Sequence, residues 1–200
     1  MNHTWVTSDW HFGHNAILKF AGRQFSSIEE HDWYLINTWN EHFQKKDEVL
    51  MLGDMFLCGK DRILEILKFL NRTRVTFVAG NHDSSTALRL MAERGWKVAP
   101  LVYRRSIFGS RKATLSHYPL ISWAGRYDAE PALHGHTHSP NPLWPGREVL
   151  PPGVRMDIGM DAHGLKPWRD DELVEFLAPE VEAVEKRLMA DADSREHDIG

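Results

Sequence analysis

The stretch VTFVAGNHD, residues 75–83, changes from apolar to strongly polar at a single glycine. A short, continuous apolar run that ends at glycine is typical of a strand buried on both faces. An apolar run that ends in a polar cluster also occurs in four further stretches, TWVTSDWH (4–11), EVLMLGD (48–54), ATLSH (113–117) and ALHGHTH (132–138). A sixth run, Val154 to Met160, carries Asp157 and Asp161. These runs predict buried strands whose carboxyl ends gather polar side chains.

Segments with helical spacing separate these runs. They are expected over residues 26–43, 62–70, 84–94, 170–177 and 179–189. The first opens with a capping box from Ser26 to Glu29, the third stops at Gly95, and the last has Pro179 near its first turn. This alternation predicts one α/β domain over residues 1–190, a layered α-β-β-α sandwich of mixed sheets flanked by helices. Residues 191–200 are polar and are expected to form a frayed, disordered tail.

The composition excludes several classes of protein. With 200 residues, 42% of them hydrophobic and 10% aromatic, the chain can bury a large core. The net charge of −4 offers no basic surface for tight binding of duplex nucleic acid, and the pairs Arg104–Arg105 and Arg111–Lys112 are expected to be solvated. The sequence has neither a signal peptide nor an apolar run of about 20 residues, so we expect a cytoplasmic protein without a membrane partner.

Histidine is abundant and cysteine is rare. The chain has 12 histidines and one cysteine, Cys58, which excludes an intramolecular disulfide and a thiolate metal cluster. Nitrogen and oxygen ligands of this kind favour Mn, Fe, Ni or Zn. Three of the histidines, His134, His136 and His138, alternate along residues 133–140 and would share one side of an extended chain.

Each polar cluster is weak evidence alone, but five of them follow a known order. They are DWH (9–11), GD (53–54), GNHD (80–83), the histidine of SHYP (117) and GHTH (135–138). Through these motifs the chain resembles the calcineurin-like metallophosphoesterase family. The opening DWHFGH (9–14) is similar to that of a branch of small bacterial and phage members. The resemblance therefore implies a phosphate-ester hydrolase with two divalent metal ions, Mn being expected and Fe, Ni or Zn the alternatives.

The resemblance also implies a role for each motif residue. Asp9, His11 and His138 match ligands of a first metal, and Asn81, His117 and His136 match ligands of a second. Asp54 matches the carboxylate that bridges both ions. Two ions about 3.5–4 Å apart can activate a water molecule and clamp the attacking and leaving oxygens. The implied reaction is in-line attack by a metal-bound hydroxide.

Further residues around the motifs have less certain roles. His82 matches the family's general acid, which protonates the leaving oxygen. Asp83 could orient that imidazole, although a helix N-cap before Ser84 is the more ordinary role. His14 could contact substrate, support His11 or pack locally. Arg23 and Arg147 are hypothetical phosphate clamps, although a surface position is the more ordinary role of each arginine when it is judged alone. His134 matches no ligand and is expected to be packed or to support the site.

The substrate is less defined than the chemistry. Aromatic residues close to the motifs could stack on a nucleobase or belong to the core; they are Trp10, Phe12, Tyr118, Trp123 and Trp144. The proline-rich loop over residues 139–153 could wall a pocket or simply connect two strands. Small single-domain relatives favour a small phosphodiester, nucleotide-type substrates included. The alternatives are a pyrophosphatase or phosphomonoesterase of the same family, or a scaffold that retains the fold without catalysis.

Overall fold

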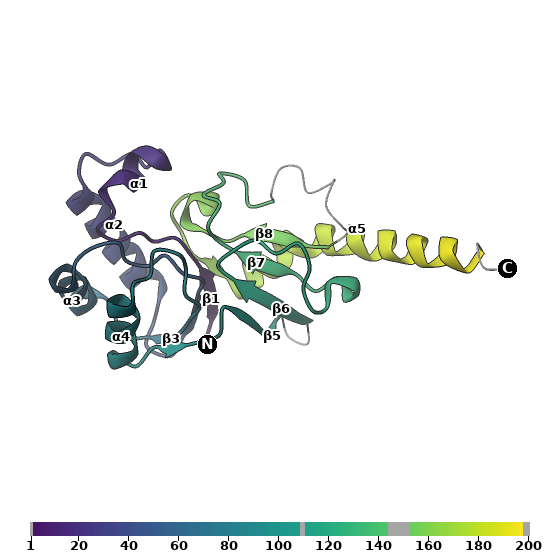
Figure 1. Cartoon of the computed structure of the whole chain (residues 1–200), viewed down its shortest axis with the longest axis horizontal. Helices are drawn as coiled ribbons and strands as arrows, with labels where there is room; N and C mark the ends of the chain where they lie inside the picture. Colours follow the sequence, from purple (N-terminus) through teal and green to yellow (C-terminus); the bar gives the residue numbers. More distant parts are fainter. Residues whose placement is uncertain (1, 109–110, 144–152, 198–200) are drawn as a thin grey trace.

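The computed structural model describes residues 2–108, 111–143 and 153–197, and it contains two mixed sheets flanked by helices (Figure 1). The candidate phosphate clamp Arg147, Trp144 and most of the proline-rich loop lie outside the described residues. The predicted fold class, a mixed α/β domain, is confirmed.

The first sheet has five strands in the order β4-β3-β2-β1-β9. The strands are β1 (Thr4–Thr7), β2 (Glu48–Met51), β3 (Arg74–Phe77), β4 (Lys97–Val98) and β9 (Trp168–Arg169). The first four are parallel, and β9 runs antiparallel to β1. Because β1, β2 and β3 are parallel neighbours, the loops that follow them leave the sheet side by side.

The second sheet has four strands in the order β5-β6-β7-β8. They are β5 (Val102–Phe108), β6 (Arg111–Ser116), β7 (Ala132–His134) and β8 (Arg155–Asp157). The strand β5 is antiparallel to β6, whereas β6, β7 and β8 are parallel. The loops after β6 and β7 carry the remaining motif histidines.

Alternate residues of the first sheet enter two separate cores. Trp5, Val49 and Met51 pack against the helices, while Val6 and Leu50 pack against the second sheet. The helices on this side are α2 (Ile28–His42), α3 (Lys60–Phe69) and α4 (Ser85–Glu93), and the short α1 (Asn15–Phe20) lies near the end of the sheet (Figure 1). This two-sided burial explains the continuous apolar runs of these strands.

The segment from residue 118 to residue 130 contacts the second sheet through Arg155. Arg155 on β8 donates from Nε to the Leu120 carbonyl at 3.0 Å and from a terminal nitrogen to the Ile121 carbonyl at 2.8 Å. Its guanidinium also lies 4.7 Å from the ring centre of Trp123. This segment contains a short 3-10 helix, η1 (Arg126–Asp128).

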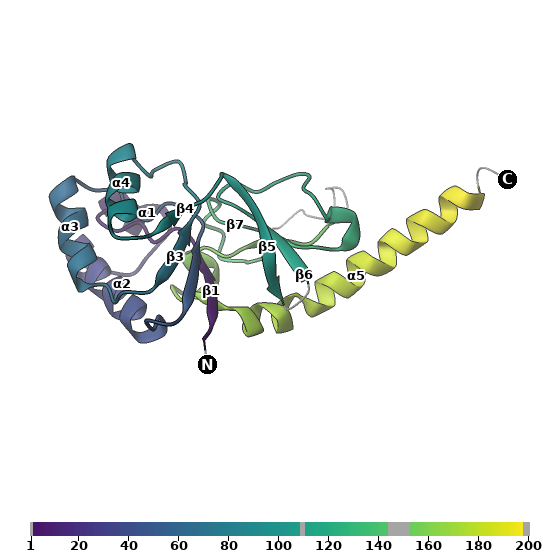
Figure 2. The same ribbon diagram turned by 90° about the horizontal axis from the view of Figure 1, so that it is seen from below.

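The C-terminal helix differs from the prediction. The two helices expected over residues 170–177 and 179–189 are one helix, α5 (Asp170–His197), with Pro179 inside it. Leu177, before the proline, and Val181 and Val184, after it, all contact the same core. Their shared burial keeps the helix continuous despite the cost of an internal proline. Figure 2 shows α5 extending beyond the rest of the molecule, into the segment expected to be a frayed tail.

The capping box of α2 is shifted by one residue from its predicted position. Ser27, not Ser26, is the N-cap, and its hydroxyl accepts a hydrogen bond from the Glu30 backbone N–H. The Glu30 carboxylate in turn accepts from the Ser26 N–H at 2.7 Å. In α4 the N-cap is Ser84, whose hydroxyl accepts from the Ala87 N–H. The interpretation of Asp83 as a helix cap is therefore wrong.

Within the described residues, no helix combines the length and the apolar character that a membrane span requires.

Candidate metal centre

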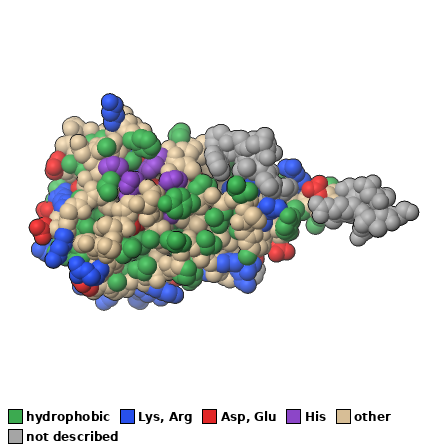
Figure 3. Space-filling view, viewed as in Figure 1, with side chains coloured by type: hydrophobic (Ala, Val, Ile, Leu, Met, Phe, Trp, Pro, Cys, Tyr) green, Lys and Arg blue, Asp and Glu red, His purple; other side chains and the backbone are tan. Residues whose placement is uncertain are grey.

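The five predicted motifs converge at the carboxyl ends of both sheets. Motif residues follow β1, β2 and β3 of the first sheet and β6 and β7 of the second, so the two sets of loops face each other. Figure 3 shows the accessible histidines gathered in one patch on this face of the molecule. All seven predicted ligands lie among the described residues: Asp9, His11, Asp54, Asn81, His117, His136 and His138.

The backbone of these loops is unusual. Seven described residues other than glycine have a positive φ, and five of the seven are predicted ligands: Asp9 (60°), His11 (55°), Asp54 (53°), His136 (72°) and His138 (49°). A left-handed conformation is unfavourable for residues with a side chain and persists only where its surroundings enforce it. The fold therefore holds these side chains in place at a cost in local stability.

Two glycines allow the loops to approach closely. A Cβ atom on Gly80 would lie 2.2 Å from Oδ1 of Asp54, and one on Gly135 would lie 2.2 Å from Oδ2 of Asp9. Any larger residue at either position would collide with a carboxylate of the cluster. Glycine is therefore required in GNHD and GHTH, because the loops approach each other too closely at this site for a larger residue.

A first group of ligand atoms consists of Asp9, His11 and His138. The Nε2 atoms of the two histidines lie 3.2 Å apart. Oδ1 of Asp9 lies 3.8 Å from Nε2 of His11 and 3.9 Å from Nε2 of His138. Three donor atoms within 4.8 Å of one another can converge on a single cation. Nitrogen and carboxylate oxygen are suitable ligands for a first-row divalent metal.

A second group consists of Asn81, His117 and His136. Oδ1 of Asn81 lies 2.9 Å from Nε2 of His117 and 2.9 Å from Nδ1 of His136. The amide oxygen is neutral, so this group adds no negative charge of its own that would repel an anionic ligand. Two imidazoles and one amide oxygen are therefore available for a second cation.

Asp54 lies between the two groups. Its Oδ2 atom is 3.7 Å from Nε2 of His11 in the first group and 3.4 Å from Nε2 of His117 in the second. Its Oδ1 atom accepts a hydrogen bond from the His82 backbone N–H at 2.9 Å. A single carboxylate in this position could contact cations in both groups.

The cluster fits divalent metal ions. Asp9 is buried, and its Oδ1 atom has no hydrogen-bond partner among the described residues. A buried carboxylate oxygen without a partner is costly unless a cation compensates it. Burial raises the pKa of Asp9, but the contacts with His11, His138 and His117 outweigh it and lower the pKa below its ordinary value. The imidazole nitrogens and the second carboxylate around Asp9 are all suitable metal ligands.

Hydrogen bonds behind the ligands orient two of the imidazoles. Nδ1 of His117 donates to the Leu52 carbonyl at 2.8 Å, which leaves Nε2 as the free lone pair. Nδ1 of His138 donates to Oδ2 of Asp161 at 2.7 Å, with the same result. A carboxylate behind a ligating histidine is a recurring feature of metal sites. Asp161 was not among the predicted site residues. Its position directly after the apolar run of β8 could have indicated a site residue, because the other motif residues also follow strands.

Arg23 is not a surface residue, and the protein itself already engages its guanidinium. It is buried, and its guanidinium donates to both carboxylate oxygens of Asp161 at 2.8 and 2.9 Å. It also donates to the Asp9 carbonyl at 2.7 Å and the Trp10 carbonyl at 3.0 Å. Arg23 therefore ties the first motif to the acid that supports His138.

His14 lies directly beside the first group. Its Nδ1 atom is 3.1 Å from Nδ1 of His11, so one ring donates to the other. Burial and the nearby His11 and His82 lower the pKa of His14 to about 4. A neutral His14 can accept the proton of His11 Nδ1, which leaves His11 Nε2 free for a cation. This contact favours the supporting role over direct substrate contact.

The charges of the acidic residues are stabilised by their partners. Burial alone would raise the pKa of Asp54, but the hydrogen bond and charge of His117 lower it to about 2. Burial opposes ionisation of Asp161 as well, and the hydrogen bonds from His138 and Arg23 lower its pKa to about 2. Both carboxylates are therefore charged at neutral pH.

Asp83 holds two motif loops together and does not orient His82. One oxygen accepts from the Asp54 N–H at 2.7 Å and the Gly80 N–H at 2.8 Å, and the other accepts from the Met55 N–H at 3.1 Å. The His82 ring instead lies over the cluster, with Nε2 4.0 Å from Oδ2 of Asp54 and a side chain that is 38% exposed. The His82 side chain is therefore close to the ligand cluster and also accessible to a bound substrate.

The remaining predicted residues are mostly in the core. Trp10, Phe12 and Trp123 are buried, which excludes them as stacking surfaces. Tyr118 is exposed, and its ring centre lies 4.7 Å from that of His136. His134 is fully buried on β7, opposite Asp157 in the register, and it belongs to neither ligand group.

The comparison with known families agrees with this geometry. The profile of the family described as calcineurin-like phosphoesterase matches residues 3–177, which include all five motifs. The chain belongs to this family. Its members are metal-dependent phosphoesterases, and the His/Asp cluster of this chain could hold the metal that such an activity requires.

Relatives of this family member occur in archaea and phages. The Gene 66 protein of Mycobacterium phage D29 is 30% identical over 201 residues, covering 88% of this chain and 96% of the relative. The uncharacterized protein MJ1445 of Methanocaldococcus jannaschii is 29% identical over 180 residues, covering 88% and 92%. The resemblance to small phage members is thereby confirmed.

One solved structure supports the fold. The protein of unknown function AQ665 from Aquifex aeolicus superposes with a TM-score of 0.65 and 18% sequence identity, covering 88% of this chain and all of the other. At this identity, the likeness concerns the fold alone.

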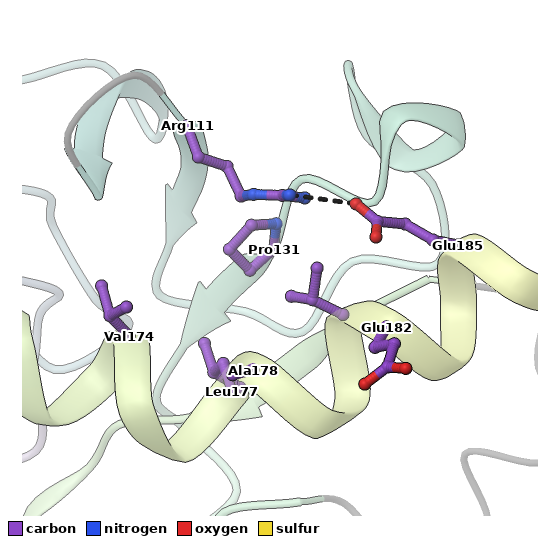
Figure 4. A pocket seen from close by; sticks show the side chains of 8 residues that line it. Arg111, Pro131, Val174, Leu177, Ala178, Glu182 and Glu185 are labelled. Atoms are coloured by element: carbon purple, nitrogen blue, oxygen red, sulfur yellow. Dashed lines mark hydrogen bonds and ion pairs between the residues drawn. The ribbon is translucent and has the colours of Figure 1, made fainter.

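A separate hollow lies away from the centre, between α5 and the second sheet (Figure 4). It has a volume of about 310 Å³, and the residues that line it include Pro131, Leu177 and Val181. An ion pair between Arg111 and Glu185, 3.0 Å long, spans one side of it. None of the predicted ligands lines this hollow.

Proposed function

We propose that this chain is a phosphoesterase with two metal ions that hydrolyses phosphodiesters in preference to monoesters. The observation that carries the proposal is the position of Asp54, whose Oδ2 atom lies within 3.7 Å of histidines from both ligand groups. Asp9, His11 and His138 would hold one ion, Asn81, His117 and His136 the other, and Asp54 would be shared. Mn is the expected metal, with Fe, Ni or Zn as alternatives.

The metals and the protein contribute different parts of the chemistry. Two divalent ions at such a site lower the pKa of a water molecule and screen the charge of the phosphate. The chain itself orients the imidazoles through Leu52, Asp161 and His14. His82 is the group that would donate a proton to the leaving oxygen, because its ring is partly exposed and its backbone is fixed by Asp54.

The preference for diesters is supported by the charges beside the centre. A phosphomonoester carries a second negative charge, which an additional guanidinium or ammonium group commonly neutralises. Two hollows lie beside the cluster, one lined by His11, His14 and His82 and the other by Phe25 and Tyr34. Among the described residues that line them, Arg23 is the only arginine or lysine, and its guanidinium is already paired with Asp161. A singly charged diester fits this environment better.

A panel of substrates tests the reaction class. The Mn-loaded protein is given a diester, a monoester, a cyclic nucleotide and a nucleoside diphosphate under the same conditions. We expect the highest kcat/KM for one of the diesters. A higher value for the monoester or the diphosphate would replace the diester proposal by one of those reactions. No turnover of any substrate by protein shown to contain metal would favour the scaffold interpretation.

The role of His82 has its own test. His82→Ala should retain its metal content and lose about 10²- to 10⁴-fold in kcat on a diester with an alkoxide leaving group. On a p-nitrophenyl ester, whose leaving group needs little protonation, the loss should be far smaller. His42→Ala, on α2, is the control. Equal losses on both esters would exclude His82 as the general acid.

A further inference from the structure

Two hollows lie next to each other on the side of the first ligand group. The smaller, about 200 Å³, is lined by His11, His14 and His82 as well as by Phe20 and His138. The larger, about 700 Å³, is also lined by Phe20 and His138 and continues past Phe25 and Tyr34. Its volume is within the range of small-molecule sites, roughly 300–1,000 Å³. A ligand bound at the metal centre could therefore extend into it past Phe20.

Phe20 is exposed in a way that packing does not explain. It is the last residue of α1 and is 74% exposed, whereas Trp10 and Phe12 of the preceding motif are fully buried. The Phe20 ring stands at 89° to that of His138, with 5.5 Å between their centres. A large apolar ring held beside a ligand histidine offers a flat contact surface for a substrate.

The other side chains of the larger hollow suit a flat, neutral and partly polar group. Phe25 and Tyr34 have ring centres 5.2 Å apart. Gln24 adds an amide, and Tyr34 adds a hydroxyl group. The guanidinium of Arg23 is engaged by Asp161 and by backbone carbonyls, so it does not provide a site for another phosphate. A nucleobase has two π-faces and polar edges, and both match this lining.

We propose that this pocket binds the base of a nucleotide-type phosphodiester, with Phe20 as the surface on which the base stacks. The inference rests on the proposed function, because it places the phosphate of the same molecule at the metal centre. It assigns a substrate-contacting role to Phe20, which belongs to none of the five motifs. Stacking accepts every base, so the pocket selects for the presence of a base more than for its identity.

Two esters with the same leaving group test the proposal. Thymidine 5′-(p-nitrophenyl) phosphate carries a base, and methyl p-nitrophenyl phosphate does not. The Mn-loaded wild-type protein should have the higher kcat/KM on the thymidine ester. Phe20→Ala should lower that kcat/KM by about 5- to 150-fold, mainly through KM, since stacking on one aromatic ring contributes to that extent. The same variant should leave the methyl ester almost unchanged.

Matched variants distinguish a loss of stacking from a nonspecific loss of structure or activity. Phe20→Trp should retain the preference for the thymidine ester. Phe69→Ala removes an aromatic ring that is 45% exposed and packs on Trp33 away from the pocket, and it should leave both esters unaffected. Equal losses on both esters in Phe20→Ala would mean that Phe20 acts by supporting His138, and the stacking role would be overturned. Unchanged values on both esters would overturn it as well.

A binding measurement distinguishes failure of this inference from failure of the proposed function. Saturation-transfer NMR with thymidine or adenosine needs no hydrolysis. If neither ester is hydrolysed, the proposed function fails, while signals at the base that Phe20→Ala removes would still support the pocket. If both esters are hydrolysed and the nucleosides give no Phe20-dependent signal, the phosphoesterase proposal stands and the nucleobase pocket is wrong.

Discussion

A buried carboxylate lies at each end of the five-stranded sheet, and the two carboxylates differ in their hydrogen bonds. At the amino end, Oδ1 of Asp47 accepts from the His3 N–H at 3.0 Å, and Oδ2 accepts from the Gln44 N–H at 2.9 Å and from Nε1 of Trp5 at 3.4 Å. At the carboxyl end, Asp9 is equally buried, and its Oδ1 atom has no partner among the described residues. Both oxygens of Asp47 are satisfied by the protein, whereas Asp9 has the hydrogen bond from the His136 N–H to Oδ2 and leaves Oδ1 suited to a cation.

This difference shows where the fold favours stability and where it favours binding. Hydrogen bonds to both oxygens make a buried carboxylate tolerable and rigid. At the carboxyl end, positive φ angles at five ligand positions and an unsatisfied oxygen both reduce stability. Such costs are expected at a site that is arranged for a cation. Substitutions at the two ends should therefore affect different properties.

The largest effect is expected from Asp9→Asn. The loss of one negative charge and one anionic ligand should lower metal affinity and kcat/KM by more than roughly 100-fold. The melting temperature of the metal-free protein should fall only slightly, since Oδ1 of Asp9 has no hydrogen bond to lose and an amide oxygen can still accept from the His136 N–H. Metal content by mass spectrometry and a thermal scan without metal provide the two readouts. A large fall in metal-free stability with normal metal content would contradict the comparison.

Asp161→Asn should have the next largest effect. It weakens the hydrogen bond that orients His138, and such changes behind a ligand lower metal affinity by about 10- to 100-fold. It also removes the charge that faces the buried Arg23, so stability should fall at the same time. Titration of the folded variant with Mn measures the first effect. A metal affinity equal to that of the wild type would show that His138 needs no support from Asp161.

Asp47→Asn should reverse the pattern of Asp9→Asn. It disturbs three hydrogen bonds at the amino end and should cost about 1–3 kcal/mol of stability, with unchanged metal content. Denaturant unfolding with and without metal measures both quantities. Metal loss in this variant would mean that the two ends of the sheet are not independent.

The same carboxylate predicts a dependence of stability on pH. Burial tends to raise the pKa of Asp47, but the hydrogen bonds from His3, Gln44 and Trp5 outweigh it and lower the pKa below its ordinary value. The stabilising contribution is therefore complete above the unfolded pKa of about 3.9 and is lost as the pH falls through the folded pKa. In Asp47→Asn the unfolding free energy should decrease less steeply below pH 4 than in the wild type. An unchanged slope would contradict this assignment.

The smallest effect is expected at the ion pair between Arg111 and Glu185, beside the hollow in Figure 4. Both side chains are more than a third exposed, so Arg111→Ala should lower the unfolding free energy by less than about 1 kcal/mol. Activity and metal content should not change, because the pair is remote from the ligands. Thermal unfolding and an activity assay check both statements.

The sequence was most informative where local pattern and burial agree. The runs that end in Asp9, Asp54 and Asn81 became β1, β2 and β3, because these strands are covered on both faces. Strand β5, with Arg104 and Arg105 inside it, was not predicted. Both arginines form ion pairs, with Glu130 and Glu48 respectively, and these distant partners are invisible in a local window.

The ligand set could be proposed from motifs, but its supporting contacts could not. Arg23 and Asp161 are 138 positions apart in the sequence, and nothing near Arg23 indicates that it is buried. Asp83 resembled a helix cap because it precedes α4, whereas its carboxylate holds the loops of Asp54 and Gly80. The sequence around Phe20 likewise gave no signal, since the proposed role of Phe20 depends on the two hollows that it lines.

The shared role of Asp54 can be tested most directly by anomalous diffraction from crystals grown with Mn²⁺. We expect two peaks next to Asp54, one among Asp9, His11 and His138 and the other among Asn81, His117 and His136. The same data from Asp54→Asn crystals should show reduced occupancy at both positions. A single peak in the wild type, or Mn²⁺ bound only elsewhere on the molecule, would contradict a centre with two metals.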